Sequence, residues 1–183
     1  MLRNAHIPVL GFVALSNTGK TTLLAKVLPL LRERGLRVGV VKHARHGFDI
    51  DHPGKDSYIL RDAGAAQIMI GSPQRWALMT ERPTPSGSRL DELLQHLDQR
   101  YLDCILVEGF KHETFPKVEV YRPSLGHPLL CLADESIVAV ASDGPLPAGV
   151  KLPVLDLNNP HEVGGFVHDI LFRDGSEYAL TPE

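Results

Sequence analysis

The segment at residues 14–22, with the sequence ALSNTGKTT, constrains the fold more than any other part of the chain. It fits the phosphate-loop pattern G-x-x-x-x-G-K-[ST], except that Ala14 stands in place of the first glycine. An apolar run at 7–14 leads into it, and a helical pattern with apolar residues on one face follows at about 20–34. Because a buried strand, this loop and an amphipathic helix occur in that order, the segment predicts a site for the phosphates of a nucleotide.

The residue types in this loop suit phosphate binding. Successive backbone N–H groups have to curl around a diphosphate, while the following helix presents its positive N-terminus to the same anion. Gly19 lets the backbone approach the phosphates, Lys20 is expected between the β- and γ-phosphates, and the Thr21 hydroxyl is expected to ligate Mg²⁺. Asn17 suits a position with positive φ. The predicted nucleotide ligands of the loop are Ser16, Asn17, Thr18, Gly19, Lys20, Thr21 and Thr22.

The rest of the chain alternates apolar runs with helical patterns, which favours an α/β architecture. Strands are predicted at 38–41, 67–70, 76–80, 104–108, 118–121, 137–141 and 154–157, and helices at about 56–63, 90–100 and 160–172. We expect the three-layer α/β/α fold of the P-loop NTPases, with a mainly parallel sheet and an extra antiparallel hairpin that includes 76–80. No shift in composition divides the chain, so residues 1–172 are expected to form a single nucleotide-binding domain, followed by a frayed tail at 173–183.

Composition excludes several classes of protein. In 183 residues, 19 Lys and Arg against 22 Asp and Glu give a net charge of −3, which is not the basic footprint of a general nucleic-acid binder. No apolar run approaches the roughly 18 residues of a membrane-spanning helix. The two cysteines, Cys104 and Cys131, lie in apolar stretches and are expected to be reduced core residues. A soluble, cytoplasmic protein that binds neither nucleic acid nor a membrane is therefore expected.

A second acidic position follows the apolar run at 104–108, which ends in Glu108. The ends of strands are where α/β sheets bind ligands. Glu108 is therefore a candidate for holding the water shell of the metal or for polarising an attacking water, and with Lys20 it makes up the predicted catalytic pair. The predicted Mg²⁺ ligands are Thr21, Glu108 and Asp49. The alternative for Glu108 is a solvated acid at the exit of a strand.

The segment at 42–57 is rich in potential ligands and supports two functional interpretations. In the first it is a switch loop, which brings Asp49 or Asp51 near Mg²⁺. The basic residues near phosphate would then be Lys42 or Arg45. In the second, histidines join the aspartates as a transition-metal site, and these histidines are His43, His46 and His52. A plain solvated loop is the third possibility.

Six motifs occur together along the chain: SNTGKTTL at 16–23, KH at 42–43, PGKDSY at 53–58, RDAGA at 61–65, RWALM at 75–79 and LVEGFK at 106–111. In this combination the chain resembles the molybdopterin-guanine dinucleotide biosynthesis protein B (MobB) family over about residues 7–172. The resemblance implies a homodimeric P-loop protein that binds GTP and has weak GTPase activity. It also implies that the protein assists the nucleotidyltransferase that joins GMP to the molybdenum-bound pterin cofactor. The expected cofactors are thus GTP and Mg²⁺, and the expected partners are that nucleotidyltransferase, molybdopterin-bearing proteins and a second copy of the chain.

The resemblance also implies roles for matching positions. Glu108 would be the second acidic motif, and the segment at 53–57 would belong to a surface that faces the nucleotide or the cofactor. Asn17 stands where the family more often has glycine. The residues that would hold phosphates and Mg²⁺ are Gly19, Lys20, Thr21 and Thr22.

Base recognition needs a further residue. A guanine reader needs a carboxylate that accepts hydrogen bonds from N1–H and the exocyclic amine, typically just after a late strand. Asp143 follows the apolar run at 137–141 and is the candidate, although the usual Asn-Lys-x-Asp motif is absent from the sequence. The alternative is that Asp143 is a turn residue in the sequence Ser-Asp-Gly-Pro.

Three rival functions use the same loop. A small-molecule kinase would need an arginine-bearing lid, for which the loop at 82–88 offers Arg82. A metal-insertion GTPase has only the histidine-rich segment in its favour, and a scaffold would bind nucleotide without turnover. Because no glutamine is placed to orient water and no arginine finger can be assigned, slow intrinsic hydrolysis is expected. Trp76 and Phe110 can anchor a partner, but packing in the core is the favoured interpretation.

Overall fold

The computed structural model describes residues 2–44, 48–82 and 89–172. Contacts divide the chain into two compact units: a larger unit, Met1–His43 with Ser88–Glu183, and a smaller unit, Ala44–Gly87. A single domain over residues 1–172 stays a prediction. The expected tail at 173–183 lies outside the described residues.

The larger unit is built on a six-stranded sheet in which all neighbouring strands are parallel. Its strands are β1 (Val9–Val13), β2 (Val38–Lys42), β5 (Cys104–Glu108), β6 (Lys117–Tyr121), β7 (Ile137–Ser142) and β8 (Val154–Asp156). They lie in the order β2-β5-β1-β6-β7-β8. The carboxyl ends of the strands therefore lie at one edge of the sheet, with the end of β1 between those of β5 and β6.

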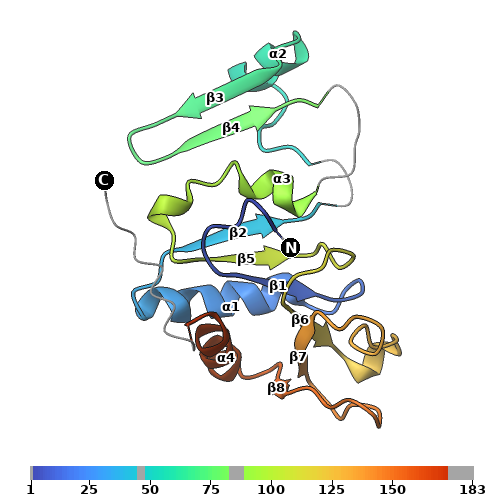
Figure 1. Ribbon diagram of the computed structural model, residues 1–183. Coiled ribbons are helices and arrows are strands. Elements are labelled where there is room, and N and C mark those ends of the chain that lie inside the picture. Colours follow the sequence, from blue (N-terminus) through green and yellow to red (C-terminus); the bar gives the residue numbers. More distant parts are fainter. Residues whose placement is uncertain (1, 45–47, 83–88, 173–183) are drawn as a thin grey trace. The chain divides into compact units, whose positions relative to one another are not determined.

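Helices cover both faces of this sheet (Figure 1). On one face, α1 (Lys20–Glu33) and α4 (Pro160–Phe172) pack against each other, and α3 (Leu90–Leu94) packs on the opposite face. Two 3-10 turns, η1 (Gln99–Tyr101) and η2 (Pro123–Leu125), follow α3 and β6. The predicted three-layer α/β/α fold with a mainly parallel sheet is confirmed. None of the described helices is long and apolar enough to cross a membrane.

The central strands send alternate side chains into two hydrophobic clusters. In β5, Leu106 joins the cluster that includes α1 and α4, whereas Ile105 and Val107 join the cluster that includes α3. This is the alternation of a strand buried on both faces. Because apolar helices cover both faces, polar side chains that are to meet a ligand have to lie at the ends of the strands.

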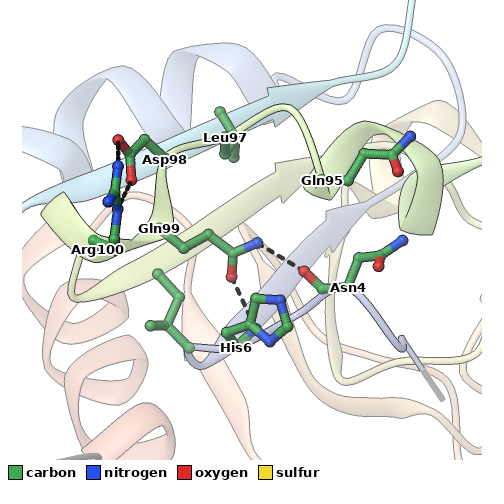
Figure 2. Close-up of a pocket in the computed structure, with 8 residues that line it drawn as sticks. Asn4, His6, Gln95, Leu97, Asp98, Gln99 and Arg100 are labelled. Carbon is green, nitrogen blue, oxygen red and sulfur yellow. Dashed lines mark hydrogen bonds and ion pairs between the residues drawn. The ribbon is translucent and has the colours of Figure 1, made fainter. Parts of the chain in front are cut away.

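The helix expected at 90–100 is shorter than predicted, because α3 ends at Leu94 and the 3-10 turn η1 follows. The buried side chain of Gln99 explains the early end. Its amide nitrogen donates to the carbonyl oxygens of Asn4 at 2.7 Å and Leu94 at 3.0 Å. Its oxygen accepts from the backbone N–H of His6 at 2.8 Å (Figure 2). These bonds tie the N-terminal segment to the sheet and engage the carbonyl group that a continuing helix would use.

The smaller unit contains α2 (Asp56–Asp62) and an antiparallel hairpin of β3 (Gln67–Gly71) and β4 (Trp76–Thr80), which confirms the predicted hairpin. Arg61 holds this unit together. Its Nη2 lies 2.8 Å from Asp49 and 3.2 Å from Asp51, and its Nη1 lies 3.3 Å from Glu81. Asp51 is the one buried side chain among the described residues of the unit. An ionic cluster, rather than a hydrophobic core, therefore links its described elements.

Candidate functional site

The phosphate loop joins β1 to α1 and contains two residues in the left-handed backbone region. These are Asn17, with φ of 63°, and Gly19, with φ of 93°, so the predicted positive φ of Asn17 is confirmed. Between them, Thr18 is buried, and its hydroxyl donates to the carbonyl oxygen of Leu15 at 3.2 Å. The ammonium of Lys20 donates to the same oxygen at 3.3 Å. The loop is thus curled by bonds within itself, as a concave anion site requires.

The start of α1 suits an anion. The helix begins at Lys20, its first turn has no acidic residue, and no side chain among the described residues caps it. Its first backbone N–H groups and its positive N-terminal end therefore favour a phosphate. The predicted loop ligands span the loop and the start of α1: Ser16, Asn17, Thr18 and Gly19 precede the helix, and Lys20, Thr21 and Thr22 are its first three residues.

Other polar side chains lie beside the loop because neighbouring strands end there. Their order along the edge follows from the strand order: Lys42 ends β2, Glu108 ends β5, Arg122 follows β6 and Asp143 follows β7. The phosphate loop, which follows β1, lies in the middle of this row. The carboxyl edge of a parallel sheet is where α/β proteins bind ligands.

Thr21 and Glu108, two of the predicted Mg²⁺ ligands, are in direct contact. The Thr21 hydroxyl donates to Glu108 Oε1 at 2.7 Å. Lys42 Nζ lies 3.4 Å from Thr21 Oγ1 and 3.4 Å from Glu108 Oε2, so a positive group already lies against both oxygen-bearing side chains. One hydroxyl and one carboxylate fit Mg²⁺, which binds few protein oxygens in nucleotide sites and completes its shell with water and phosphate oxygens.

Arg122, which sequence reasoning missed, joins the phosphate loop to Asp143. Its Nε donates to the carbonyl oxygen of Thr18 at 2.9 Å, and its Nη1 forms an ion pair with Asp143. The only signal in the sequence is a basic residue directly after a strand. The sheet order shows that this strand, β6, lies beside β1, so that a residue at its end lies next to the phosphate loop.

Asp143 also lies in a turn, as the alternative interpretation proposed. The hydroxyl of Ser142 donates to the carbonyl oxygen of Gly144 at 2.8 Å and accepts from the backbone N–H of Gly144 at 3.3 Å. The turn holds Asp143 beside Arg122 rather than removing it from the edge. Its proposed contact with guanine stays a prediction.

The backbone after Glu108 is packed closely against the end of β2. Gly109 has φ of 100°, and a Cβ placed on it would lie 2.9 Å from the Cβ of His43. The ring of Phe110 is buried and contacts the His43 ring, with 4.7 Å between centroids. Core packing is therefore confirmed for Phe110. The same expectation is wrong for Trp76, whose side chain lies on the hairpin and is 66% exposed.

Asp49, the third predicted Mg²⁺ ligand, lies in the smaller unit with its carboxylate 2.8 Å from Arg61. Its role at a metal stays a prediction. Within the residues that the structure describes, no group of three or more His, Cys, Asp or Glu side chains is arranged to hold a metal ion. Two candidates from this segment, Arg45 and His46, lie outside the described residues.

Comparison with known families identifies the relatives of this site. The model of the family described as MobB, molybdopterin guanine dinucleotide synthesis protein B, matches residues 9–143. The chain belongs to the MobB family. The match runs from β1 to Asp143, so it contains the phosphate loop and the whole row of strand-end residues.

MobB relatives cover nearly the full chain. The molybdopterin-guanine dinucleotide biosynthesis adapter protein of Escherichia coli (strain K12) is 51% identical over 168 residues, which are 91% of this chain and 95% of that protein. The adapter protein of Haemophilus influenzae is 40% identical over 168 residues, 92% of each chain. The crystal structure of Bacillus subtilis MobB has a TM-score of 0.68 and 29% identity, covering 90% of this chain and 98% of that one. A crystal structure of molybdopterin-guanine biosynthesis protein B has a TM-score of 0.70 at 27% identity, covering 89% and 98%.

Membership of the MobB family confirms the resemblance and places the chain in molybdopterin guanine dinucleotide synthesis.

Proposed function

We propose that the chain is a GTP-binding adapter of molybdopterin guanine dinucleotide synthesis, which binds GTP with Mg²⁺ and hydrolyses it slowly. One observation carries the proposal. The phosphate loop lies between two carboxylates at the carboxyl edge of the sheet, Glu108 on the side of β5 and Asp143 on the side of β7. This arrangement suits a guanine nucleotide. Its phosphates would bind in the loop, Glu108 would hold the metal ion at the phosphate end, and Asp143 would bind the base at the other end.

The phosphate side of the proposal rests on Lys20, Thr21 and Glu108. Lys20 lies in the first turn of α1, where its ammonium can stabilise the negative charge that develops on the γ-phosphate. Thr21 and Glu108 would hold Mg²⁺, which supplies charge neutralisation at the phosphate oxygens when bound. Glu108 can also polarise an attacking water. None of the side chains described at this edge is a glutamine, the residue that orients water in faster GTPases, so slow turnover is proposed.

The base side of the proposal rests on Asp143. Its carboxylate would accept from the N1–H and exocyclic amine of guanine, donors that adenine lacks at the same positions. The ion pair with Arg122 holds the carboxylate of Asp143 at the edge of the sheet even when no base is bound.

Membership of the same family supports the proposed partners. The relatives from Escherichia coli and Haemophilus influenzae are adapter proteins of molybdopterin-guanine dinucleotide biosynthesis. The proposed partners of this chain are the nucleotidyltransferase that attaches GMP to molybdopterin and molybdopterin-bearing proteins. The proposed compartment is the cytoplasm, where the two free cysteines, Cys104 and Cys131, stay reduced.

A second copy of the chain is the proposed occupant of an apolar face on the hairpin. Met69 pairs with Leu78 across the hairpin, and Trp76 lies two residues from Leu78 on the same face. Their exposed fractions are 66%, 42% and 66%. The described part of the smaller unit buries no apolar side chain of its own. A symmetric dimer would bury this face on both copies, in agreement with the homodimer that the family resemblance implies.

Sedimentation of the full chain tests the dimer. Wild type is expected to sediment as a dimer at micromolar concentration, and Trp76→Ser is expected to shift it toward the monomer. Leu132→Ser is the matched control, because Leu132 is also an exposed apolar side chain, 63% exposed, but belongs to the larger unit. A monomeric wild type, or a Trp76→Ser variant as dimeric as the control, contradicts this part of the proposal.

Lys20→Ala tests the central role of the phosphate loop, with Lys26→Ala as control because Lys26 is exposed on the same helix. We expect Lys20→Ala to weaken GTP binding at least about tenfold, the loss of one charge-assisted hydrogen bond. It should also stop phosphate release. In a mixture with GTP, molybdopterin and the nucleotidyltransferase, wild type and Lys26→Ala should raise the yield of molybdopterin guanine dinucleotide, and Lys20→Ala should not.

Other outcomes separate the rivals. If Lys20→Ala raises the yield as well as wild type does, the chain is a scaffold for which nucleotide is incidental. If the γ-phosphate appears on a small molecule rather than as free phosphate, the kinase interpretation replaces the proposal.

A further inference from the structure

One guanidinium connects the two loops that the proposed function assigns to opposite ends of the nucleotide. The Nε of Arg122 donates to the carbonyl oxygen of Thr18 in the phosphate loop at 2.9 Å. The Nη1 of the same side chain pairs with Oδ2 of Asp143. Thr18 is only 2% exposed, so its end of this link is fixed within the fold.

Packing reinforces the link on both sides. The guanidinium of Arg122 packs against the phosphate loop, because a Cβ placed on Gly19 would lie 3.5 Å from its Nη2, at ordinary van der Waals contact. On the other side, a Cβ placed on Gly144 would lie 3.2 Å from the ring of Pro123. Pro123 follows Arg122 directly and Gly144 follows Asp143 directly, so the two loops are in contact as well as hydrogen bonded.

The geometry of the link requires arginine. A planar guanidinium presents its N–H groups in fixed directions and can reach two acceptors at once, whereas a lysine ammonium is a single point charge on a flexible stem. The pair is also partly shielded from water, since the side chains of Arg122 and Asp143 are 33% and 21% exposed. Such a pair holds its geometry better than a fully exposed one.

We propose that Arg122 is a positioning residue for base recognition, which holds Asp143 at a fixed place relative to the phosphate loop. Oδ2 of Asp143 is engaged by Arg122, while Oδ1 has no hydrogen-bond partner among the described residues. When the phosphates bind in the loop, Arg122 already holds the Asp143 carboxylate in place, so Oδ1 can accept from the N1–H edge of guanine. Less conformational freedom is then lost on binding. The inference rests on the proposed function, because it assumes that the loop binds a nucleotide and that Asp143 meets the base.

The ratio of GTP affinity to ATP affinity distinguishes positioning from a direct contact with phosphate. A residue that holds Asp143 changes this ratio and leaves the binding of a base-free phosphate chain almost unchanged. A residue that binds phosphate directly weakens GTP, ATP and inorganic tripolyphosphate by the same factor and leaves the ratio alone.

The experiment is calorimetric titration of the full chain with GTP, ATP and inorganic tripolyphosphate, each with Mg²⁺. The variants are Arg122→Gln, Arg122→Lys, Asp143→Asn and the double variant Arg122→Gln/Asp143→Asn. We expect wild type to favour GTP over ATP at least about tenfold, and each single variant to bring the ratio close to one. The double variant should lower the ratio no further, because the two residues act as one unit. Tripolyphosphate affinity should change less than about threefold in any variant.

Three results would overturn the inference: an unchanged GTP to ATP ratio in Arg122→Gln, an equal loss for all three ligands, or additive effects of the two single substitutions.

Thermal unfolding of each variant is measured alongside. If Arg122→Gln does not fold, the ratio of GTP to ATP affinity is compared in Arg122→Lys instead. This variant keeps the positive charge but lacks the planar guanidinium that reaches two acceptors. A wild type without preference for GTP overturns the guanine part of the proposed function itself. That result is visible before any variant is made, and so differs from a wild-type preference that Arg122→Gln preserves.

Discussion

Lys117 is a charged side chain that lies almost wholly inside the larger unit, with 1% of its surface exposed. Its ammonium donates to the carbonyl oxygens of Glu113 at 2.7 Å and Lys111 at 3.3 Å, and it forms an ion pair with Asp134 at 2.6 Å. A buried charge is tolerated only when it is paired and hydrogen bonded, as this one is. Lys117 thus ties two loops to β6, the strand that Arg122 follows.

We expect Lys117→Met to lower the free energy of unfolding by about 2–4 kcal/mol, because it leaves Asp134 and two carbonyl groups without their buried partner. Urea unfolding measures the change. Lys151→Met, the same substitution at an exposed lysine, should stay within about 0.5 kcal/mol of wild type. Equal effects of the two substitutions would show that the buried ammonium contributes no net stability.

For single residues, roles that depend on local backbone conformation could be predicted from the sequence. Roles that depend on contacts with distant parts of the chain could not. The positive φ of Asn17 follows from the residue type and its place in a phosphate loop. Arg122 gains its role from Thr18 and Asp143, which lie 104 and 21 positions away along the chain. No local pattern contains that information.

Among the elements, the smaller unit is unusual because a charged cluster links its described parts. Arg61, on α2, contacts Asp49 and Asp51 before the helix and Glu81 after β4. Its guanidinium also lies over the ring of Tyr58, 5.1 Å from the centroid. One side chain therefore connects the segment before the helix, the helix itself and the hairpin.

Arg61→Met should loosen these elements without unfolding the larger unit. Hydrogen exchange measured by mass spectrometry is expected to speed up in α2, β3 and β4, and to stay unchanged in β1 and β5, because the larger unit has its own core. Arg75→Met, at an exposed arginine in the hairpin turn, is the control and should change little. Faster exchange throughout both units in Arg61→Met would contradict a role confined to the smaller unit.

The existence and type of elements were predicted well, and most strand and helix bounds differ from the prediction by at most two residues. Apolar runs and one-sided helical patterns depend on neighbouring residues, so they can be read locally. The helix predicted at 90–100 failed because the side chain of Gln99 bonds to Asn4 and His6, which lie more than 90 positions away. Tertiary bonds of this kind override a local helical pattern.

At the scale of the whole molecule, two aspartates link stability to pH. The hydrogen bond from the Arg37 side chain holds the pKa of Asp103 below its usual value. Burial works to raise the pKa of Asp134, but hydrogen bonds from Lys117 and Ser136 outweigh it, so this pKa is also lowered. Both carboxylates therefore contribute stability that is fully present above the ordinary aspartate pKa of about 4 and is lost as the pH falls through their lowered folded-state values.

We expect the free energy of unfolding, measured by urea at a series of pH values, to fall on acidification below about pH 4. Asp103→Asn and Asp134→Asn should each be less stable than wild type at neutral pH and should lose less stability on acidification. Glu135→Gln, at an exposed carboxylate, is the control. Variants whose pH profiles run parallel to that of wild type would show that these two carboxylates do not cause the loss.

The sheet order is the property of the whole molecule that the sequence could not supply. Alternating strands and helices predict a parallel sheet, but not that β5 and β6 lie on either side of β1. That order sets Glu108 on one side of the phosphate loop, and Arg122 with Asp143 on the other. The candidate site could therefore be predicted as a set of residues, but not as an arrangement.

The central claim is that this edge binds a guanine nucleotide, and calorimetric titration of the wild-type chain with GTP and with ATP, both with Mg²⁺, tests it most directly. The account predicts saturable GTP binding at least about tenfold tighter than ATP binding, a difference of about 1.4 kcal/mol. Equal or tighter binding of ATP would leave the phosphate loop in place and contradict the role of Asp143. Absence of binding to either nucleotide would contradict the claim as a whole.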